Sequence, residues 1–160
     1  IYNELMRLIL KYIPDSSVEA EFTIFYNNSA NKKADLRIIL PDNREYFIDV
    51  SICNSGAKSY QAKDILNLLS EREKAKMNQY AIVGFSELDS NLIPFIVDVS
   101  GSLGKKALSF IDLLNSFASQ KVTNFKSIVL SRLSTILAIG LAKTIVSYNN
   151  IFETSNSFAP

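Results

Sequence analysis

The sequence predicts an α/β domain, in which one mixed β-sheet carries helices on its faces. Three segments rich in β-branched and aromatic residues follow one another with turn residues between them, which predicts a three-stranded meander. A long stretch without Gly or Pro comes next and predicts a helix, and the short apolar runs after it predict buried strands. A meander, a crossover helix and further strands together are typical of one mixed sheet with helices on its faces.

Size and composition fit this class. The chain has 160 residues, enough for one domain with a core of its own. We assign residues 1–152 to that domain and residues 153–160 to a loose polar tail. The net charge of +1 excludes a strongly basic domain that grips nucleic acid by bulk charge, although it allows a local basic patch. Histidine is absent, which excludes histidine-based catalysis and histidine metal ligands.

The first predicted elements are a helix and the meander. Apolar residues at helical spacing predict a helix over Tyr2–Tyr12. Alternating patterns then predict three strands, Val18–Tyr26, Ala34–Leu40 and Tyr46–Ile52. The residues from Pro41 to Asn43 form a turn signature between the second and third strands.

The second half alternates helices with short strands. The predicted elements are a helix over Tyr60–Gln79, strands over Tyr80–Phe85 and Ile93–Val99, and helices over Lys105–Ser119 and Thr123–Tyr148. The most apolar stretch, Ile128–Val146, contains Arg132 and Lys143, which favours a packed helix over a membrane span, so we expect no membrane contact. More than one face of this helix is apolar, which predicts packing across the sheet or contact with another chain or domain.

Two aspartates stand in the predicted meander where apolar residues would be ordinary. Strand residues alternate between the faces of a sheet, so Asp35 points away from the side of Leu36, and Asp49 away from the side of Ile48. If the two strands pair through the turn near residue 42, both aspartates are equally far from its centre and face each other. The sequence therefore predicts two carboxylates on one patch of the sheet.

Two neighbouring carboxylates repel each other unless a cation lies between them. Oxygen ligands without histidine suit Mg²⁺ or Mn²⁺, and such a metal can bind a phosphate oxygen and activate a water molecule. The alternative is that Asp35 and Asp49 are solvated surface residues, or salt-bridge partners of Arg37 or Lys33.

Several further segments occur in an order that resembles a known family. The tripeptide KAD that ends at Asp35 is similar to a basic-Pro-Asp signature, and DVS from Asp49 is similar to an Asp-Val-Ser/Thr motif. KMNQY from Lys76 is similar to a Lys-x-x-Lys-Tyr pattern, and PFIV and LSTILAIGLAK match later landmarks. From about Glu19 to Tyr148 the chain resembles the restriction-like endonuclease domain at the C-terminus of non-LTR retrotransposon polyproteins, a branch of the PD-(D/E)XK nuclease superfamily.

This resemblance implies a restriction-endonuclease-like core with the order α-β-β-β-α-β, followed by extra C-terminal helices. It also implies that Asp35 and Asp49 are catalytic residues and ligands of Mg²⁺ or Mn²⁺, with Lys76 as the catalytic lysine. The chain departs from the pattern at three positions, with Ala34 for proline, Ser51 for the superfamily's lysine and Gln79 for the family's second lysine.

The predicted helix offers more than one lysine. Lys76 and Tyr80 share one helical face, so Lys76 either reaches the two carboxylates or is a solvated partner of Glu73. Lys63 at the helix start is a second candidate, and Lys74 points elsewhere around the helix.

A third carboxylate would complete the metal site. Glu21 in the first strand is assigned as that ligand, with Glu19 and Glu4 as alternatives. Basic residues around the proposed site either contact phosphates or belong to a mixed-charge surface; they are Lys32, Lys33, Arg37, Arg44 and Lys58.

These observations give two hypotheses for the function. The first is a metal-dependent endonuclease domain that nicks target DNA, with DNA and the reverse transcriptase of the same polyprotein as partners. The second is a nuclease fold kept as an inactive binding or structural module.

The chain starts at Ile1 without a methionine, so we expect a piece of a longer protein. Cys53 is the one cysteine and no secretion signal is visible, which favours the nucleus or another reducing compartment inside the cell; we expect Cys53 to be a buried or half-buried thiol.

Overall fold

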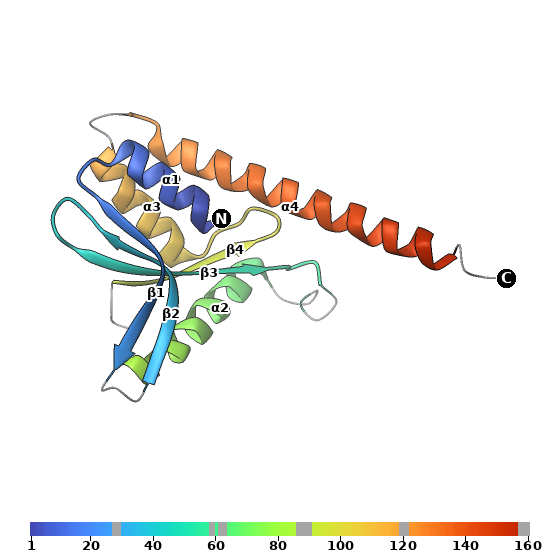
Figure 1. Ribbon diagram of the computed structural model, residues 1–160, viewed down its shortest axis with the longest axis horizontal. Coiled ribbons are helices and arrows are strands. Elements are labelled where there is room, and N and C mark those ends of the chain that lie inside the picture. Colours follow the sequence, from blue (N-terminus) through green and yellow to red (C-terminus); the bar gives the residue numbers. More distant parts are fainter. Residues whose placement is uncertain (27–29, 58–59, 61–63, 86–90, 119–121, 157–160) are drawn as a thin grey trace.

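The computed structural model describes residues 1–26, 30–57, 60, 64–85, 91–118 and 122–156. Within these residues the elements follow the order α-β-β-β-α-β-α-α (Figure 1). Their bounds are α1 Tyr2–Tyr12, β1 Ser17–Tyr26, β2 Ala30–Ile39, β3 Glu45–Cys53, α2 Ile65–Tyr80, β4 Leu92–Asp98, α3 Lys105–Ala118 and α4 Phe125–Asn156. The strands form one sheet with the order β1-β2-β3-β4. The first three strands are antiparallel neighbours and β4 is parallel to β3, so the predicted α/β class, meander and mixed sheet are confirmed.

The turn between β2 and β3 sets the register of the meander. Leu40 donates its amide to the Arg44 carbonyl at 3.0 Å, and Asn43 donates to the Leu40 carbonyl at 2.9 Å. Asn43 has a φ of 63°, a left-handed conformation that asparagine adopts more readily than most residues. The ladder then pairs Leu36 with Ile48, which is the register that the sequence predicted around residue 42.

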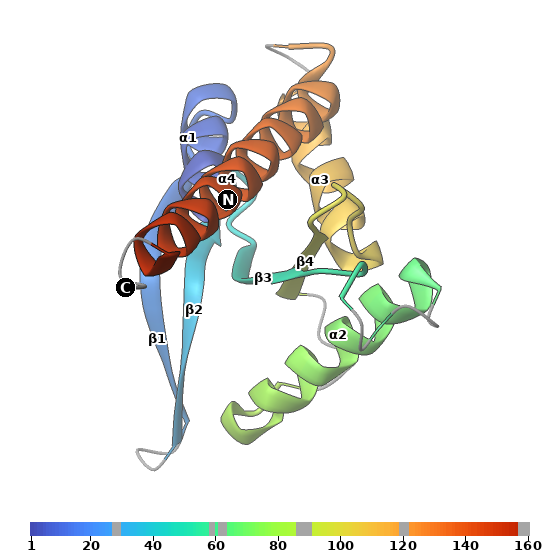
Figure 2. The same cartoon turned by 90° about the vertical axis from the view of Figure 1, so that its right-hand side faces the viewer.

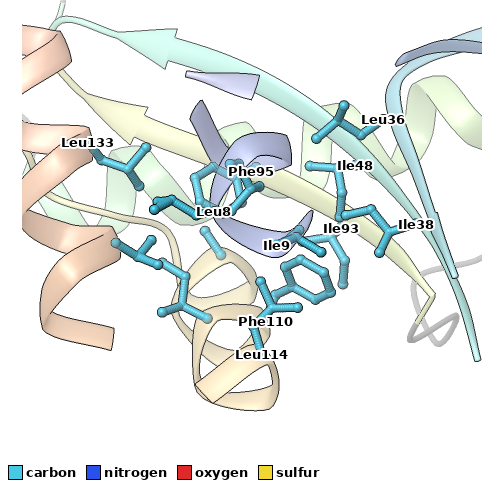
Figure 3. Packing of buried hydrophobic residues seen from close by; sticks show 14 of the residues in the cluster. Leu8, Ile9, Leu36, Ile38, Ile48, Ile93, Phe95, Phe110, Leu114 and Leu133 are labelled. Carbon is cyan, nitrogen blue, oxygen red and sulfur yellow. The ribbon is translucent and has the colours of Figure 1, made fainter. Parts of the chain in front are cut away.

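Helices cover the two faces of the sheet unequally. Figures 1 and 2 show α1, α3 and α4 gathered on one face and α2 alone on the other. On the first face the side chains of these three helices merge with those of β2, β3 and β4 into one apolar cluster, part of which appears in Figure 3. Its fully buried members include Leu8, Ile48, Phe95 and Phe110. This cluster is the core of the domain.

The β4 strand lies at an edge of the sheet, which explains how it accommodates a proline. The Gly104 amide binds the Ile96 carbonyl from outside at 2.9 Å, and the Asp98 amide binds the Ser102 carbonyl at 2.8 Å. Even-numbered positions of β4 therefore direct their backbone groups away from β3. Pro94 is one of them, so its missing N–H falls on the free edge and costs the sheet no hydrogen bond.

The last helix, α4, packs on other helices rather than directly on the sheet. Phe125, Val129, Leu133 and Leu137 recur every four residues and are buried against α1 and α3. The helix then continues past the body of the domain (Figure 1). By length and composition alone, Phe125–Thr144 could also cross a membrane, but one such helix is weak evidence for a span.

One predicted strand is absent, and several predicted boundaries were wrong. The apolar run Tyr80–Phe85 is not a strand, because Tyr80 ends α2 and Ala81–Val83 forms a 3₁₀ helix that stops at Gly84, whose φ is 89°. Such short apolar runs have no period that separates strand from helix. The helix α2 begins at Ile65 rather than at residue 60, and α4 continues to Asn156, four residues into the segment expected to be a loose tail. Residues 157–160 lie outside the described part of the chain.

Candidate functional site

The register places the two predicted aspartates where β2 and β3 separate. Leu36 and Ile48 form the last ladder pair, so Asp35 and Asp49 occupy the next facing positions. Beyond that pair a side chain replaces the backbone as hydrogen-bond acceptor, because Asp35 Oδ2 accepts the backbone amide of Val50 at 2.7 Å. Asp35 is thus held by its own side chain against the strand that carries Asp49.

Asp49 is a buried carboxylate beneath α2. Only 8% of the residue is exposed, and both carboxylate oxygens contact the Lys76 ammonium, Oδ2 at 3.0 Å and Oδ1 at 3.2 Å. Burial raises the pKa of Asp49, the Lys76 charge partly opposes that rise, and the nearby charge of Asp35 adds to it. Asp49 is therefore more easily protonated than an ordinary aspartate, because the Lys76 ammonium only partly offsets the effects of burial and of the Asp35 charge.

Lys76 reaches Asp49 because α2 crosses the sheet with one polar stripe turned inward. Asp64 caps the start of the helix, its Oδ2 accepting the amides of Leu66 at 3.1 Å and Asn67 at 3.2 Å. The Lys76 side chain is 25% exposed, whereas Lys74 lies on the exposed side of the helix. The alternative pairing of Lys76 with Glu73 is wrong, because Glu73 accepts the Lys106 amide at 2.7 Å instead.

Tyr80 completes the inner stripe of α2. Its hydroxyl donates to the backbone carbonyl of Lys33 at 2.8 Å and also neighbours the Asp49 carboxyl. Burial, followed by the charges of Asp49 and Asp35, raises the pKa of Tyr80, so the phenol stays protonated and remains a donor at neutral pH. The sequence placed Tyr80 on the face of Lys76 but did not predict this contact, which depends on where the β2 backbone lies.

The structure does not bring a third carboxylate into this group. Glu21 has a φ of 56° and interrupts the β1–β2 ladder opposite Asp35. Its carboxylate is 62% exposed and pairs with Lys33 at 2.6 Å. Glu19 pairs with Arg37 at 3.5 Å. Among the described residues no cluster of three or more acidic or cysteine side chains is arranged to hold a metal ion, so the assignment of Glu21 as a ligand finds no geometric support.

Glu4, the other alternative, belongs to a different part of the molecule. It lies on α1, on the opposite face of the sheet from α2 (Figures 1 and 2), and its carboxylate binds Arg7. The two faces of a sheet do not share a metal site, so Glu4 does not join the aspartates.

Acidic neighbours hold most of the basic residues around the site. Lys33 pairs with Glu21, Arg37 with Glu45 and Glu19, and Arg44 with Asp42. This pattern fits the mixed-charge surface better than a continuous phosphate-binding patch. Lys58 and Lys63, which the sequence also offered, lie outside the described residues.

A further buried carboxylate, Asp98, was not predicted from the sequence. It stands at the end of β4 with no exposed surface; its Oδ1 accepts the Ser55 amide at 2.7 Å and its Oδ2 accepts the Ser100 amide at 2.8 Å. Burial alone would raise the pKa of Asp98, but the hydrogen bonds from Ser100 and Ser55 outweigh it and hold the pKa below its ordinary value. Cys53 is buried beside this carboxylate, and burial raises the pKa of its thiol. Both carboxylate oxygens of Asp98 therefore hold backbone amides, which makes it a structural residue.

Comparison of the sequence with protein-family models and with curated proteins found no match in either. The function is therefore inferred from the chemistry of the site itself. Asp35 and Asp49 supply carboxylate oxygens, which are the ligands that Mg²⁺ and Mn²⁺ prefer. Mg²⁺ is often bound by only one or two carboxylates together with water and substrate phosphate, so by the chemistry of their donor atoms the two aspartates would suit such an ion without a third acid.

Proposed function

We propose that this chain is a metal-dependent endonuclease domain that nicks DNA by attack of water on a phosphodiester. The observation that carries the proposal is the meeting of Asp35, Asp49 and Lys76 at the point where two strands separate. A buried carboxylate with a lysine aimed at it, next to a second and partly buried carboxylate, is a costly arrangement that folding alone does not require. Phosphoryl transfer, in contrast, needs carboxylates for a metal and a cation near the phosphate.

The order of the helices and strands supports the same functional hypothesis. The chain runs α-β-β-β-α-β before its last two helices, and that is the order of the restriction-endonuclease-like core that the sequence resembles. The two aspartates come from β2 and β3 and the lysine from the helix that follows, as the resemblance implies for Asp35, Asp49 and Lys76. The partners that follow from the proposal are DNA and the reverse transcriptase of a parent polyprotein, in the nucleus or another reducing compartment.

Each residue has a distinct task in the proposed reaction. A divalent ion bound by Asp35 and Asp49 would supply polarisation of the phosphate and an activated water. The Val50 amide fixes Asp35, and burial keeps bulk water away from Asp49. The Lys76 ammonium pairs with Asp49 in the free protein, and in the proposed reaction it would stabilise negative charge that develops on the phosphate or orient the attacking water.

The test is nicking of supercoiled plasmid DNA by the 160-residue chain with Mg²⁺, with Mn²⁺ and with chelator. We expect open circular product only with metal, and we expect Asp49→Ala to reduce the rate by on the order of 100-fold or more. Lys76→Ala should also slow the reaction. Asp112→Ala is the matched control, because Asp112 is an exposed carboxylate on α3 that pairs with Lys126 far from the site.

Two results would contradict the proposal. Equal nicking by wild type and Asp49→Ala would remove Asp49 from the site and point to a contaminating nuclease. Absence of nicking by the wild type under all metal conditions, together with DNA binding that does not change in Asp49→Ala, would favour the inactive binding module. The Asp49–Lys76 ion pair gives this second candidate some support, because it satisfies Asp49 in part without a metal.

A further inference from the structure

Glu73 links α2 to the start of α3 through a side-chain hydrogen bond. It lies one helical turn before Lys76, only 9% of the residue is exposed, and its Oε1 accepts the Lys106 amide in the first turn of α3 at 2.7 Å. Burial raises the pKa of Glu73, and the Lys106 amide opposes that rise. A carboxylate at a helix N-terminus satisfies an amide that has no partner within the helix. The carboxylate thus spans from one helix to the start of another.

A glycine makes room for this contact. A Cβ at position 104 would lie 2.4 Å from Glu73 Oε1, closer than non-bonded atoms approach, so any larger residue at this position would displace the Glu73 carboxylate. The Gly104 amide is bonded to the Ile96 carbonyl of β4 at 2.9 Å, and the Gly104 carbonyl accepts the Leu108 amide at 3.0 Å. Glu73 is therefore bonded to α3 at the Lys106 amide and lies beside Gly104, whose own amide bonds to the sheet.

A second polar anchor holds α2 on the other side of Lys76. Tyr80 donates its hydroxyl to the Lys33 carbonyl of β2 at 2.8 Å. Lys76 lies between the two anchors, three residues after Glu73 and four before Tyr80. The apolar contacts of α2 with the sheet form two separate clusters, one around Met77 and one around Leu68, so the two polar contacts share with two small apolar clusters the task of defining the rotation of the helix.

We propose that Glu73, seated in the space left by Gly104, is a positioning residue that fixes the rotation of α2 and so aims Lys76 at Asp49. The inference rests on the proposed function for its catalytic meaning, but the aiming itself is a property of the free protein. A rotation of α2 that moved the ammonium by about 1 Å would cost on the order of 10- to 100-fold in rate.

The variants separate the contact from the charge. Glu73→Ala removes the carboxylate, and Gly104→Ala fills its seat. Glu73→Gln keeps an oxygen that can accept the Lys106 amide and should therefore retain most of the wild-type behaviour. The controls are Glu71→Gln, an exposed carboxylate on the same helix, and Gly140→Ala, whose added Cβ would meet nothing within 4 Å. Because Glu73→Ala and Gly104→Ala break the same contact, their effects should not add in the double variant.

Two readouts are measured together. The first is the acylation rate of each lysine by an amine-reactive reagent without DNA or metal, followed by peptide mass spectrometry. Lys76 should react slowly in the wild type and faster in Glu73→Ala and Gly104→Ala, approaching the exposed Lys74 of the same helix, which is the internal reference. The second is plasmid nicking, where the turnover number should fall on the order of 10-fold or more in both variants while the KM for DNA is unchanged.

The outcomes distinguish this inference from the proposed function. If the wild type does not nick, the proposed function fails, and the acylation of Lys76 still decides whether Glu73 aims it. If Glu73→Ala and Gly104→Ala lower the melting temperature but leave Lys76 as slow to react as in the wild type, Glu73 is a structural cap and the inference is overturned. A Glu73→Gln variant as impaired as Glu73→Ala would also overturn it, since the accepting oxygen would then not be what matters.

Discussion

The two faces of the sheet bury different kinds of side chains. The face covered by α1, α3 and α4 buries one continuous apolar cluster, whereas the face covered by α2 buries two small clusters with polar residues between them. That polar strip contains Asp49, Lys76 and Tyr80, with Glu73 at its edge. Both faces bury apolar side chains, but the α2 face also buries charged groups.

The difference separates folding from chemistry. Burial of apolar area is the dominant favourable term in folding, so the continuous cluster supplies most of the stability. Buried ion pairs recover their desolvation cost only in part, so the strip under α2 contributes little or even opposes folding. The sheet can carry an electrostatically costly site on one face because its opposite face buries a continuous apolar cluster.

The largest expected effect comes from breaking the apolar face. Phe95→Ala removes a fully buried ring from the centre of the cluster and should lower the free energy of unfolding by about 3–5 kcal/mol, measured by urea denaturation. Phe25→Ala on β1 is the control, since this ring is 70% exposed and its loss should have little effect. Equal effects of the two substitutions would show that the cluster does not dominate the stability.

The sequence predicted the apolar face well because two local rules agree there. Alternation along the strands assigned Leu36 and Ile48 to the same side, and the Pro41–Asn43 turn fixed which residues of β2 and β3 pair. The same two rules carried Asp35 and Asp49 to facing positions. A register prediction fixes both faces at once, so the aspartates followed from the apolar residues next to them.

Contacts between segments distant in sequence were not predictable in the same way. Glu73 meets the Lys106 amide across 33 residues, and Tyr80 meets the Lys33 carbonyl across 47. No periodicity encodes either contact, because each depends on how α2 lies on the finished sheet. Glu21 pairs with Lys33 instead of joining the two aspartates for a different reason: its positive φ breaks the strand alternation on which the prediction rested.

An intermediate effect is expected at Asp98, a buried aspartate on the same side of the sheet as Asp49. Asp98→Asn removes one of the two oxygens that accept the Ser55 and Ser100 amides, so it should lower the free energy of unfolding by about 1–3 kcal/mol at neutral pH. The pKa of Asp98 is lower in the folded state than its ordinary value, so its contribution is present above that ordinary value and is lost as the pH falls through the folded pKa. Urea denaturation of both proteins as the pH is lowered should show the difference between them shrinking. A difference that stays constant with pH would mean that ionised Asp98 is not what the amides require.

The smallest effect, and one of opposite sign, is expected from Asp49→Asn measured with chelator present. The pKa of Asp49 is higher in the folded state, so between the ordinary value and the raised one the folded protein holds more protons than the unfolded chain. The free energy of unfolding of the wild type therefore falls as the pH rises through that window, and the neutral amide escapes this loss. Asp49→Asn should match the wild type below about pH 4 and exceed its stability by about 1 kcal/mol or less near neutrality. If it were instead destabilised as much as Asp98→Asn, the pair with Lys76 would outweigh the cost of burial. The strip under α2 would then be a stabilising feature of the fold, and the strongest physical reason to regard it as a site would be lost.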